Sequence, residues 1–275
     1  MPAADGITLD RSGGRTVRLR HRFVEAHGLR TALVVWPDNG LPPAMLLPGL
    51  TGTYRGLIPL AREAVHTRPI LVDLPGHGDT DVPTWWRQPD LRAWFADVHA
   101  AVAADYGAPA LVVAHSFACL TVPPGTPDVT FVCPVPAVQP VTMAAARVLR
   151  RALRLPALTE AFNEPLGSAL RDLWMVKRKT WATWRELLAM DREEWRITPG
   201  QRSYQAGLTR VMTGPDQFAG VAPRRVVVVD RDVLAGRHTA RDMAARFPDA
   251  ELIVLDSGHL VVIEDAPTLA STIGL

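Results

Sequence analysis

A serine, an aspartate and a histidine each follow a separate apolar run of this 275-residue chain. Ser116 comes after LVVAH, Asp232 after RRVVVVDR and His259 after LIVLDSG. A serine hydroxyl is a weak nucleophile until an adjacent base takes its proton, and an imidazole oriented by a carboxylate is such a base. If the fold brings these three side chains together, their types predict nucleophilic attack on a carbonyl carbon.

The residues around Ser116 suit a nucleophile. Ala114 and Ala118 flank it two residues away on each side. A serine on a sharp turn from strand to helix has strained backbone angles, and only small flanking residues fit between the neighbouring elements. The A-x-S-x-A pattern also fits a buried serine without a catalytic role, so the other two residues must decide between these interpretations.

His259 follows the tight turn Asp256-Ser257-Gly258, which would carry it to the end of a strand. Its imidazole could accept the serine proton and return it to a leaving group. A loop histidine bonded to a backbone carbonyl would give the same local pattern. The chain order of serine, acid and histidine, with the histidine near the end of the sequence, favours the catalytic interpretation.

The segment RRVVVVDRDVLAG offers two candidates for the acid. Asp230 directly continues the expected strand, whereas Asp232 lies two residues into the following loop, where its carboxylate can turn back toward the imidazole Nδ1. We therefore expect Asp232 to fix the tautomer of His259 and to stabilise its protonated form. The other aspartate would then cap the next helix.

Short β-branched runs alternate with helical patterns in the first half of the chain, which predicts a mostly parallel sheet with helices on both faces. Residues 16–26 and 29–36 would form a hairpin around His27-Gly28. The next expected strands are 44–49, 69–75, 110–116 and 129–136, and a helix is expected at 90–107, from Asp90 to Gly107.

The pattern changes between residues 137 and 216, where helical stretches occur without a convincing strand. Residues 141–216 carry 13 lysines and arginines against 8 acidic residues, a net charge of +5, while the rest of the chain has −3. Expected strands return at 224–230 and 251–259, with a helix at 237–247 between them. We therefore predict a core of residues 1–136 and 217–275, with a helical cap inserted at 137–216.

Four motifs in this order resemble those of the α/β-hydrolase superfamily, namely MLLPGLTGT, VDLPGHGDTD, AHSFA and DSGH. The resemblance spans nearly all of the chain outside the helical insertion and implies the α/β-hydrolase fold. It also implies that the backbone N–H groups of Leu50 and Phe117 form an oxyanion hole. Such donors can each stabilise a transition state by roughly 3 to 4 kcal/mol.

The chain departs from the pattern of this superfamily at three places. Pro48 replaces a histidine that is often found before the loop glycine, and Thr80 stands where a serine is frequent. The helix after Ser116 is cut short by Pro123-Pro124-Gly125, which would reduce its packing against the next strand. We expect these changes to affect local stability more than chemistry.

These observations predict a serine hydrolase that cleaves a carboxylic ester, thioester or lactone of a small hydrophobic substrate through an acyl-enzyme. Hydrolysis of a carbon–carbon bond, or acyl transfer to an acceptor other than water, would use the same three residues. A ligand-binding protein of the same fold would not need all three. Trp174, Trp181 and Trp184 of the insertion are the candidates for lining an apolar pocket, although packing of the insertion onto the core would also use large aromatic side chains.

Composition narrows the choice of partners to a small molecule. A formal charge of +2 without basic runs among aromatic residues argues against nucleic acid. No spacing typical of a metal site and no G-x-G-x-x-G after a strand is present, so neither metal nor nucleotide cofactor is expected. The N-terminal residues lack the pattern of a secretory signal, and no apolar run is long enough to span a membrane, so we expect a cytoplasmic protein. The sequence does not specify an oligomeric state.

Four further residues are given structural roles. Cys119 and Cys133 lie in apolar runs and are expected to be reduced and buried. His115 should point to the opposite side of its strand from Ser116 and be buried behind the site. His77 lies in a glycine-rich turn and is expected to stabilise that loop.

Overall fold

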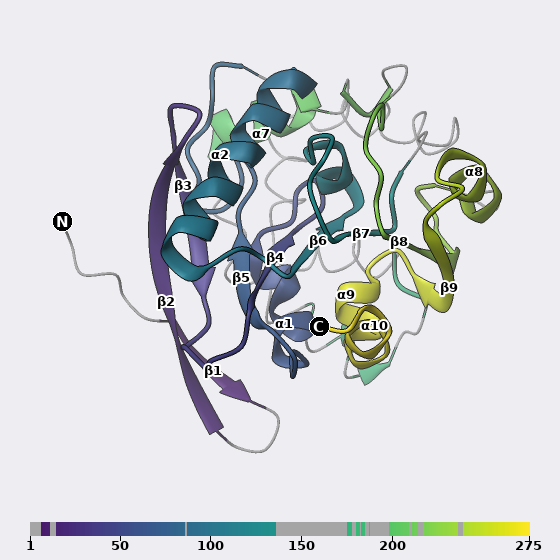
Figure 1. Ribbon diagram of the computed structural model, residues 1–275, viewed down its shortest axis with the longest axis horizontal. Helices are drawn as coiled ribbons and strands as arrows, with labels where there is room; N and C mark the ends of the chain where they lie inside the picture. The colour runs from purple at the N-terminus through teal and green to yellow at the C-terminus, as the bar shows by residue number, and fades with distance from the viewer. Residues whose placement is uncertain are drawn as a thin grey trace, which may run out of the picture.

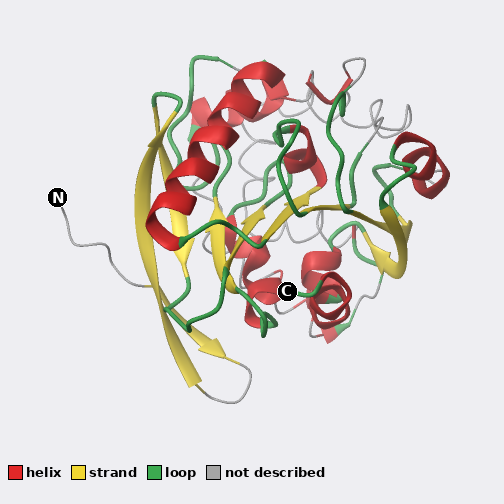
Figure 2. Ribbon diagram, in the orientation of Figure 1, coloured by secondary structure: helices red, strands yellow, loops and turns green. Residues whose placement is uncertain are grey.

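The protein has one mixed sheet with helices on both faces (Figures 1 and 2). The computed structural model describes residues 7–11, 15–85, 87–135, 175–177, 180–181, 183–184, 187, 198–208, 211–213, 217–235 and 239–275. Nine strands pair in the order β1-β2-β3-β5-β4-β6-β7-β8-β9. The α/β architecture predicted from the alternating apolar runs is confirmed.

The first three strands form an antiparallel edge of the sheet. They are β1 (Ile7–Arg11), β2 (Arg15–Ala26) and β3 (Leu29–Val35). The predicted hairpin between β2 and β3 is confirmed, and its turn residues His27 and Gly28 have φ angles of 49° and 72°, as the tight turns of hairpins require. Strand β1 was not predicted, because its run of five residues is ordered by antiparallel pairing with residues farther along the chain.

The remaining strands run parallel to one another. They are β4 (Pro43–Leu47), β5 (Arg68–Val72), β6 (Leu111–His115), β7 (Val129–Val132), β8 (Arg225–Arg231) and β9 (Glu251–Gly258). Every residue of β4, β6 and β7 is buried. Their continuous apolar runs are what a parallel strand covered on both faces requires.

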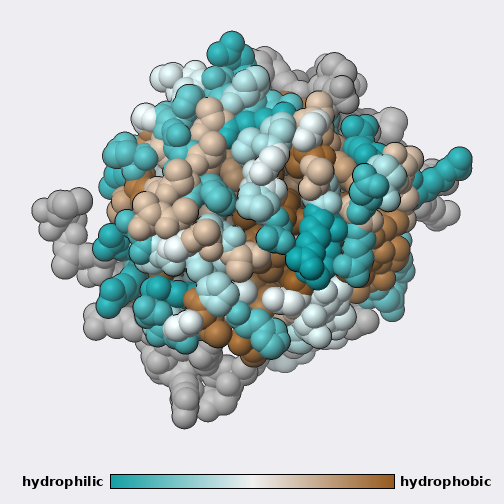
Figure 3. Space-filling model, in the orientation of Figure 1, coloured by the Kyte–Doolittle hydropathy of each residue, from teal (hydrophilic) through white to brown (hydrophobic). Residues whose placement is uncertain are grey.

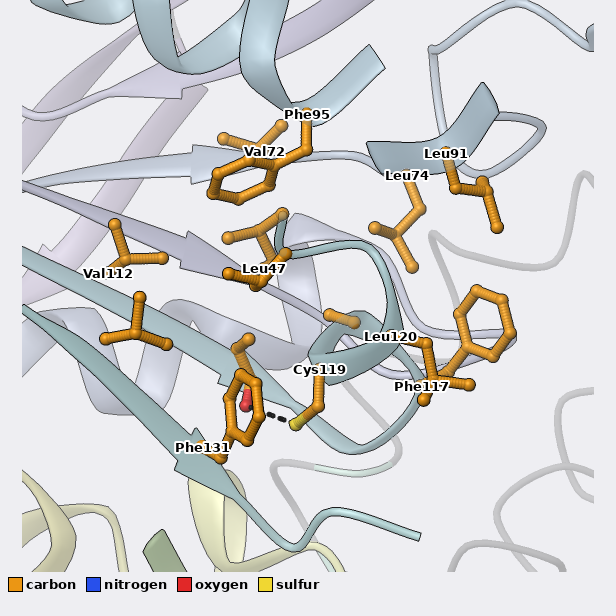
Figure 4. Close-up of a cluster of buried hydrophobic side chains, with 14 of the residues drawn as sticks. Leu47, Val72, Leu74, Leu91, Phe95, Val112, Phe117, Cys119, Leu120 and Phe131 are labelled. Carbon is orange, nitrogen blue, oxygen red and sulfur yellow. Dashed lines mark hydrogen bonds between the residues drawn. The ribbon is translucent and has the colours of Figure 1, made fainter. Parts of the chain in front are cut away.

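Helices cover the two faces with separate hydrophobic clusters. One cluster includes residues of α2 (Gln88–Tyr106) and α8 (Thr239–Arg246), and Figure 4 shows part of it around Phe95 and Val72. The other includes residues of α1 (Ile58–Arg62), α9 (Val261–Glu264) and α10 (Ala266–Ile273). Neighbouring residues of β5 divide between them, Val72 facing the first cluster and Leu71 the second. This alternation is the two-residue period of a strand.

The helix expected at 90–107 is present with a different start. Helix α2 begins at Gln88, with Pro89 in its first turn, and Asp90 follows as an acidic residue of that turn. Proline suits this position because the first N–H groups of a helix have no intrahelical partner. The helix ends before Gly107, whose φ angle is 93°.

The insertion is described only in part. Between Val132 and Arg225 the described residues contain helix α7 (Pro199–Leu208), the short 3-10 helix η3 (Val211–Thr213) and no strand. Residues 137–174 and 188–197 of the predicted cap lie outside the described residues. The division into 1–136, 137–216 and 217–275 therefore stays a prediction.

The surface mixes polar and apolar residues, as Figure 3 shows for one face. Large apolar side chains that are exposed come from separate elements, including Phe23 on β2 and Val254 on β9. Among the described helices, none is both long and apolar enough to cross a membrane.

Candidate active site

Ser116 lies at the turn between β6 and a short 3-10 helix, η2 (Ser116–Leu120). Its φ angle is 55°, in the left-handed region that residues with a side chain seldom adopt. Ala114 and Ala118 are both 0% exposed, so a larger side chain at either position would have no room. The small flanking residues and the strained turn are the features that the sequence pattern predicted.

His259 follows β9 directly and brings its imidazole to Ser116. The Ser116 hydroxyl donates a hydrogen bond of 2.9 Å to His259 Nε2. His259 is only 2% exposed, and its backbone N–H donates to the carbonyl of Met175 at 2.8 Å. An acceptor nitrogen of a buried imidazole therefore faces the hydroxyl.

Asp232 lies on the other side of the same ring. His259 Nδ1 and Asp232 Oδ2 are 2.9 Å apart, and Asp232 Oδ1 accepts hydrogen bonds of 2.9 Å from the backbone N–H groups of Leu234 and Ala235. Burial alone would raise the pKa of Asp232, but the adjacent imidazole and the accepted hydrogen bonds hold it below its usual value. An ionised Asp232 keeps the proton of His259 on Nδ1 and leaves Nε2 free to accept.

Asp230, the other candidate for the acid, forms its described bonds with residues other than His259. Its Oδ2 is 2.7 Å from Lys177 Nζ, and its Oδ1 accepts a hydrogen bond of 3.1 Å from the backbone N–H of Ser257. The residues that would begin the next helix lie outside the described ones, so the capping role stays a prediction, while the described bond to Ser257 shows Asp230 supporting the turn that precedes His259. Of the two candidates, the structure brings Asp232 to the imidazole.

Gly49 holds the loop after β4 directly against Ser116. A side chain at this position would place its Cβ 3.0 Å from Ser116 Cβ and 3.2 Å from His115 Nδ1. The next residue, Leu50, is half-buried, and Phe117 lies in the first turn of η2, where backbone N–H groups have no intrahelical acceptor. Of the two predicted oxyanion residues, Phe117 follows Ser116 in the sequence, and Leu50 follows Gly49, which contacts Ser116.

His77 supports that loop, as expected. The backbone N–H of Thr51 donates to His77 Nε2 at 3.1 Å, while His77 Nδ1 lies 2.8 Å from the carbonyl oxygen of Pro75. Burial lowers the pKa of His77 to about 4, so the ring is neutral and donates to Pro75 from Nδ1. It joins the loop after β4 to the loop after β5.

Asp73 is a buried residue that also supports these two loops. The sequence analysis included it in a motif but gave it no role of its own. Its two carboxylate oxygens accept hydrogen bonds from the backbone N–H groups of Tyr54 and Asp79, at 2.7 and 3.2 Å. Burial raises the pKa of Asp73 to about 7, although these two bonds oppose the change. Thr80 donates to the carbonyl of Asp73 and accepts from the N–H of Ala32, so the threonine fills this position with both bonds made.

His115 is buried, as expected, and lies against the base. Its Nε2 is 3.0 Å from the backbone oxygen of His259, and the two ring centroids are 5.2 Å apart. Burial and the neighbouring His259 lower the pKa of His115 to about 3, so the neutral ring donates this bond. The expectation of a residue buried behind the site did not include this contact, because the position of the β9 turn cannot be predicted from the strand pattern.

Glu264 ties the insertion to the turn that carries His259. Its Oε2 accepts hydrogen bonds from the backbone N–H groups of Lys177, at 2.8 Å, and Gly258, at 3.1 Å. Lys177 Nζ also pairs with Asp256 and Asp230. Sequence reasoning did not identify Glu264 or Lys177, since they are 87 residues apart and meet only in the folded chain.

The predicted pocket tryptophans are only partly described. Trp181 is 73% exposed, whereas Trp184 is half-buried. Trp174, together with Trp195, lies outside the described residues. A role for these side chains in binding a substrate stays a prediction.

Helix α7 docks beside the site. Gln201 and Gln205 donate side-chain hydrogen bonds to the carbonyls of Gly78 and Gly76, at 2.8 and 3.0 Å. The Tyr204 ring lies so close to Gly76 that a Cβ there would collide with it. This end of the insertion is therefore attached to the loop after β5.

Both cysteines are unpaired and buried, as expected. Cys119 donates to the carbonyl of Ala114 at 3.1 Å, drawn as a dashed line in Figure 4. Cys133, directly after β7, lies beside the candidate triad, where its sulfur and the possible ligand atoms of Asp232 and His259 are all within 4.8 Å of one another. Burial, followed by the charge of Asp232, raises the pKa of the Cys133 thiol well above its ordinary value. The sequence analysis predicted no such grouping.

Comparisons with known proteins agree with this arrangement. A model described as the alpha/beta hydrolase family matches residues 44–272. No match was found among curated proteins.

Solved structures share the fold at low sequence identity. A protein of Acinetobacter baumannii AYE that was assigned as a lipase has a TM-score of 0.70 and 16% identity, covering 92% of this chain and 89% of that one. A carboxylesterase of Bacillus subtilis has a TM-score of 0.66 and 14% identity, covering 93% and 90%. A 2-hydroxy-6-oxo-6-phenylhexa-2,4-dienoate hydrolase of Rhodococcus has a TM-score of 0.63 and 18% identity, covering 94% and 100%. At such identities these structures indicate the fold alone.

Proposed function

Because the chain belongs to the α/β hydrolase family, we propose that it is a serine hydrolase that cleaves a carboxylic ester, thioester or lactone of a small hydrophobic substrate through an acyl-enzyme. The observation that carries this proposal is the chain of two 2.9 Å contacts from Ser116 Oγ to His259 Nε2 and from His259 Nδ1 to Asp232 Oδ2. A merely structural serine has no need of a buried base that is oriented by a buried acid.

The reaction begins with the attack of Ser116 Oγ on the carbonyl carbon. The serine proton passes to His259 Nε2, and the ionised Asp232 stabilises the imidazolium that forms. The N–H groups of Leu50 and Phe117 donate to the oxyanion of the tetrahedral intermediate. When the intermediate collapses, His259 returns the proton to the leaving group, and Ser116 remains acylated.

Water completes the cycle by the same route. His259 Nε2 takes a proton from the water as its oxygen attacks the acyl carbon, and the second tetrahedral intermediate releases the acid and restores the Ser116 hydroxyl. His115 and Glu264 act as positioning residues, since they bond to the backbone of His259 and of the turn before it.

The direct test is labelling with a fluorophosphonate, which reacts with an activated serine. We expect one label per chain, at Ser116, followed by turnover of acyl esters in a panel of increasing chain length and ring content. The Ser116→Ala variant is the control for both measurements. A protein that takes up no label at Ser116 would rule out the proposed nucleophile.

Carbon–carbon bond hydrolysis is the alternative reaction on the same residues. The Rhodococcus structure bears the name of a dienoate hydrolase, but its 18% identity carries only the fold. Such a substrate needs a carbanion leaving group that an adjacent carbonyl stabilises. Turnover of a vinylogous diketone with no turnover of any ester would replace the ester proposal by this one.

The substrate class is tested by the described tryptophans. We expect Trp184→Ala to lower kcat/KM for bulky esters more than for short ones, because the half-buried ring would contact the acyl group. Trp181→Ala tests the other described candidate, whose side chain is 73% exposed and should therefore affect bulky esters less than Trp184 does. If the loss in Trp184→Ala only follows a loss of melting temperature, the residue packs the insertion and does not select the substrate.

A further inference from the structure

Three buried side chains from neighbouring strand ends converge behind the imidazole. Cys133 follows β7, Asp232 follows β8 and His259 follows β9, and these strands are adjacent in the sheet. The ligand atoms of the three side chains all lie within 4.8 Å of one another. The residues are 0%, 6% and 2% exposed. A sulfur, an oxygen and a nitrogen donor therefore share one enclosed space.

The Cys133 thiol is the one donor of this group that the proposed reaction does not use. Among the described residues its sulfur makes no hydrogen bond, whereas the other cysteine, Cys119, donates to the carbonyl of Ala114. The backbone of Cys133 has a φ angle of 50°, and its N–H donates to the carbonyl of Val227 at 2.8 Å, which fixes the residue directly after β7. In the part of the chain that the structure describes, the thiol thus lies beside the triad without a hydrogen-bond partner.

We propose that Cys133, Asp232 and His259 bind a thiophilic divalent cation of the zinc group, Zn²⁺ or Cd²⁺, and that this binding switches the triad off. Thiolate, imidazole and carboxylate are the three ligand types that such ions take in proteins. Hard cations such as Mg²⁺ and Ca²⁺ prefer sites made of oxygen alone and would not compete here.

The charges of the site suit this occupant. One divalent cation with a thiolate, a carboxylate and a neutral imidazole has no net charge. Burial of the complex then avoids the large cost of an uncompensated charge away from water. The same three side chains without a thiolate would leave the cation with an excess positive charge.

The binding reaction balances with the release of one proton. The Cys133 S–H bond breaks, its proton leaves to solvent, and a sulfur–metal bond forms. The neutral His259 moves its proton from Nδ1 to Nε2, so that Nδ1 can bind the metal, and the hydrogen bond from Nδ1 to Asp232 Oδ2 is lost. No electron is transferred.

This exchange explains the loss of activity. In the triad Nε2 accepts the proton of Ser116. In the metal complex Nε2 carries a proton and can only donate, so Ser116 has no base. Because the three ligands are nearly inaccessible to solvent, inhibition should develop slowly as the site opens, and a chelator should reverse it.

The test uses Cd²⁺ with the whole protein, in buffer without chelator or added thiol. We expect the wild-type protein to bind one Cd²⁺ with a new thiolate-to-metal absorption band in the ultraviolet and to lose ester hydrolysis with time. In Cys133→Ser the band should vanish, and the Cd²⁺ concentration for half inhibition should rise by about 100-fold or more. Loss of a residue that only hydrogen-bonds to a metal ligand already lowers metal affinity by about 10- to 100-fold, and Cys133 would be a ligand itself. Each variant is compared with its own rate in the absence of metal.

Cys119→Ser is the matched control. This second buried cysteine lies outside the group of ligands, so the variant should keep both the band and the inhibition of the wild type. Should Cys133→Ser fail to fold, Cys133→Ala serves in its place. Asp232→Asn tests a second ligand, and for this variant the affinity for Cd²⁺ is measured from the absorption band and not from inhibition.

The inhibition rests on the proposed function, but the binding does not. An absorption band that needs Cys133, in a protein that hydrolyses no ester, would support the metal site and count against the proposed reaction. Wild-type protein that binds no Cd²⁺ at about millimolar concentration would overturn the metal site. Equal binding and inhibition in Cys133→Ser would overturn it as well.

Discussion

At the scale of single residues, Ser116 combines a reactive group with a backbone that other side chains avoid. Its φ angle of 55° is imposed by the turn between β6 and η2 and does not depend on the hydroxyl. The hydroxyl itself makes one contact that matters for chemistry, the 2.9 Å bond to His259. Removal of the oxygen should therefore separate catalysis from folding.

We expect Ser116→Ala to lower kcat/KM by roughly 10⁶-fold, as loss of a triad nucleophile does. Ligand affinity and melting temperature should remain close to those of the wild type, because alanine fits the same small space. The measurements are steady-state kinetics and thermal unfolding followed by circular dichroism. Retention of more than about one per cent of the activity would contradict the role of Ser116.

Asp232 and Asp230 form a matched pair for the acid. Asp232→Asn should lower kcat by roughly 10⁴-fold, since an amide in place of the carboxylate favours the wrong tautomer of His259. Asp230→Asn should cost less than about 10-fold, because this side chain pairs with Lys177 at a partly exposed position. Kinetics of the two purified variants decide the matter, and the reverse ranking would make Asp230 the acid.

At the scale of elements, the loops after β4 and β5 position the site through one buried carboxylate. Asp73 accepts backbone N–H groups from both loops, and Gly78 passes over it with a φ angle of 49°. A Cβ at Gly78 would overlap the Asp73 carboxylate. The loop therefore requires glycine for space as well as for backbone conformation.

Gly78→Ala should lower the free energy of unfolding by at least about 2 kcal/mol more than Gly274→Ala does. Gly274 is the control, because its φ angle of 71° lies in the same left-handed region while nothing lies within 4 Å of its Cβ position. Urea unfolding of the two variants measures the difference. Equal losses would mean that the Asp73 contact adds no constraint beyond the backbone.

At the scale of the whole molecule, buried ionisable groups make the free energy of unfolding depend on pH. Burial lowers the pKa of His77 to about 4 and that of His115 to about 3, and it raises the pKa of Asp73 to about 7. As pH falls from neutral, the unfolded chain takes up protons on its histidines that the folded chain does not, which destabilises the fold. Asp73 acts in the opposite sense, because its folded form takes up a proton first.

The His77→Gln variant isolates one of these contributions. The stabilisation by neutral His77 is complete above pH 6.5 and is lost as pH falls through about 4. Between pH 7 and 4 the wild type should therefore lose roughly 2 to 3 kcal/mol more unfolding free energy than His77→Gln. Urea unfolding at several pH values gives the free energy of unfolding of both proteins as a function of pH. His115 and Asp73 are present in both, so their contributions cancel in the difference. Parallel curves would show that His77 is not buried as a neutral ring.

The sequence by itself determined the architecture and the candidate residues. Apolar runs such as LVVAH and VVVV need burial on both faces, and this requirement predicts parallel strands under helices without knowledge of their order. Local backbone geometry requires the small residues around Ser116 and the turn residues before His259. Such local signals are readable because each depends on a few neighbouring residues.

Only the tertiary structure decided which side chains meet. Asp230 and Asp232 are two residues apart, yet one pairs with Lys177 and the other with His259, because the direction of a side chain in a loop is set by the elements around it. The same holds for Cys133, which reaches Asp232 and His259 only through the adjacency of β7, β8 and β9. Contacts between residues distant in sequence depend on strand order and loop packing, and no run of neighbouring residues encodes either one.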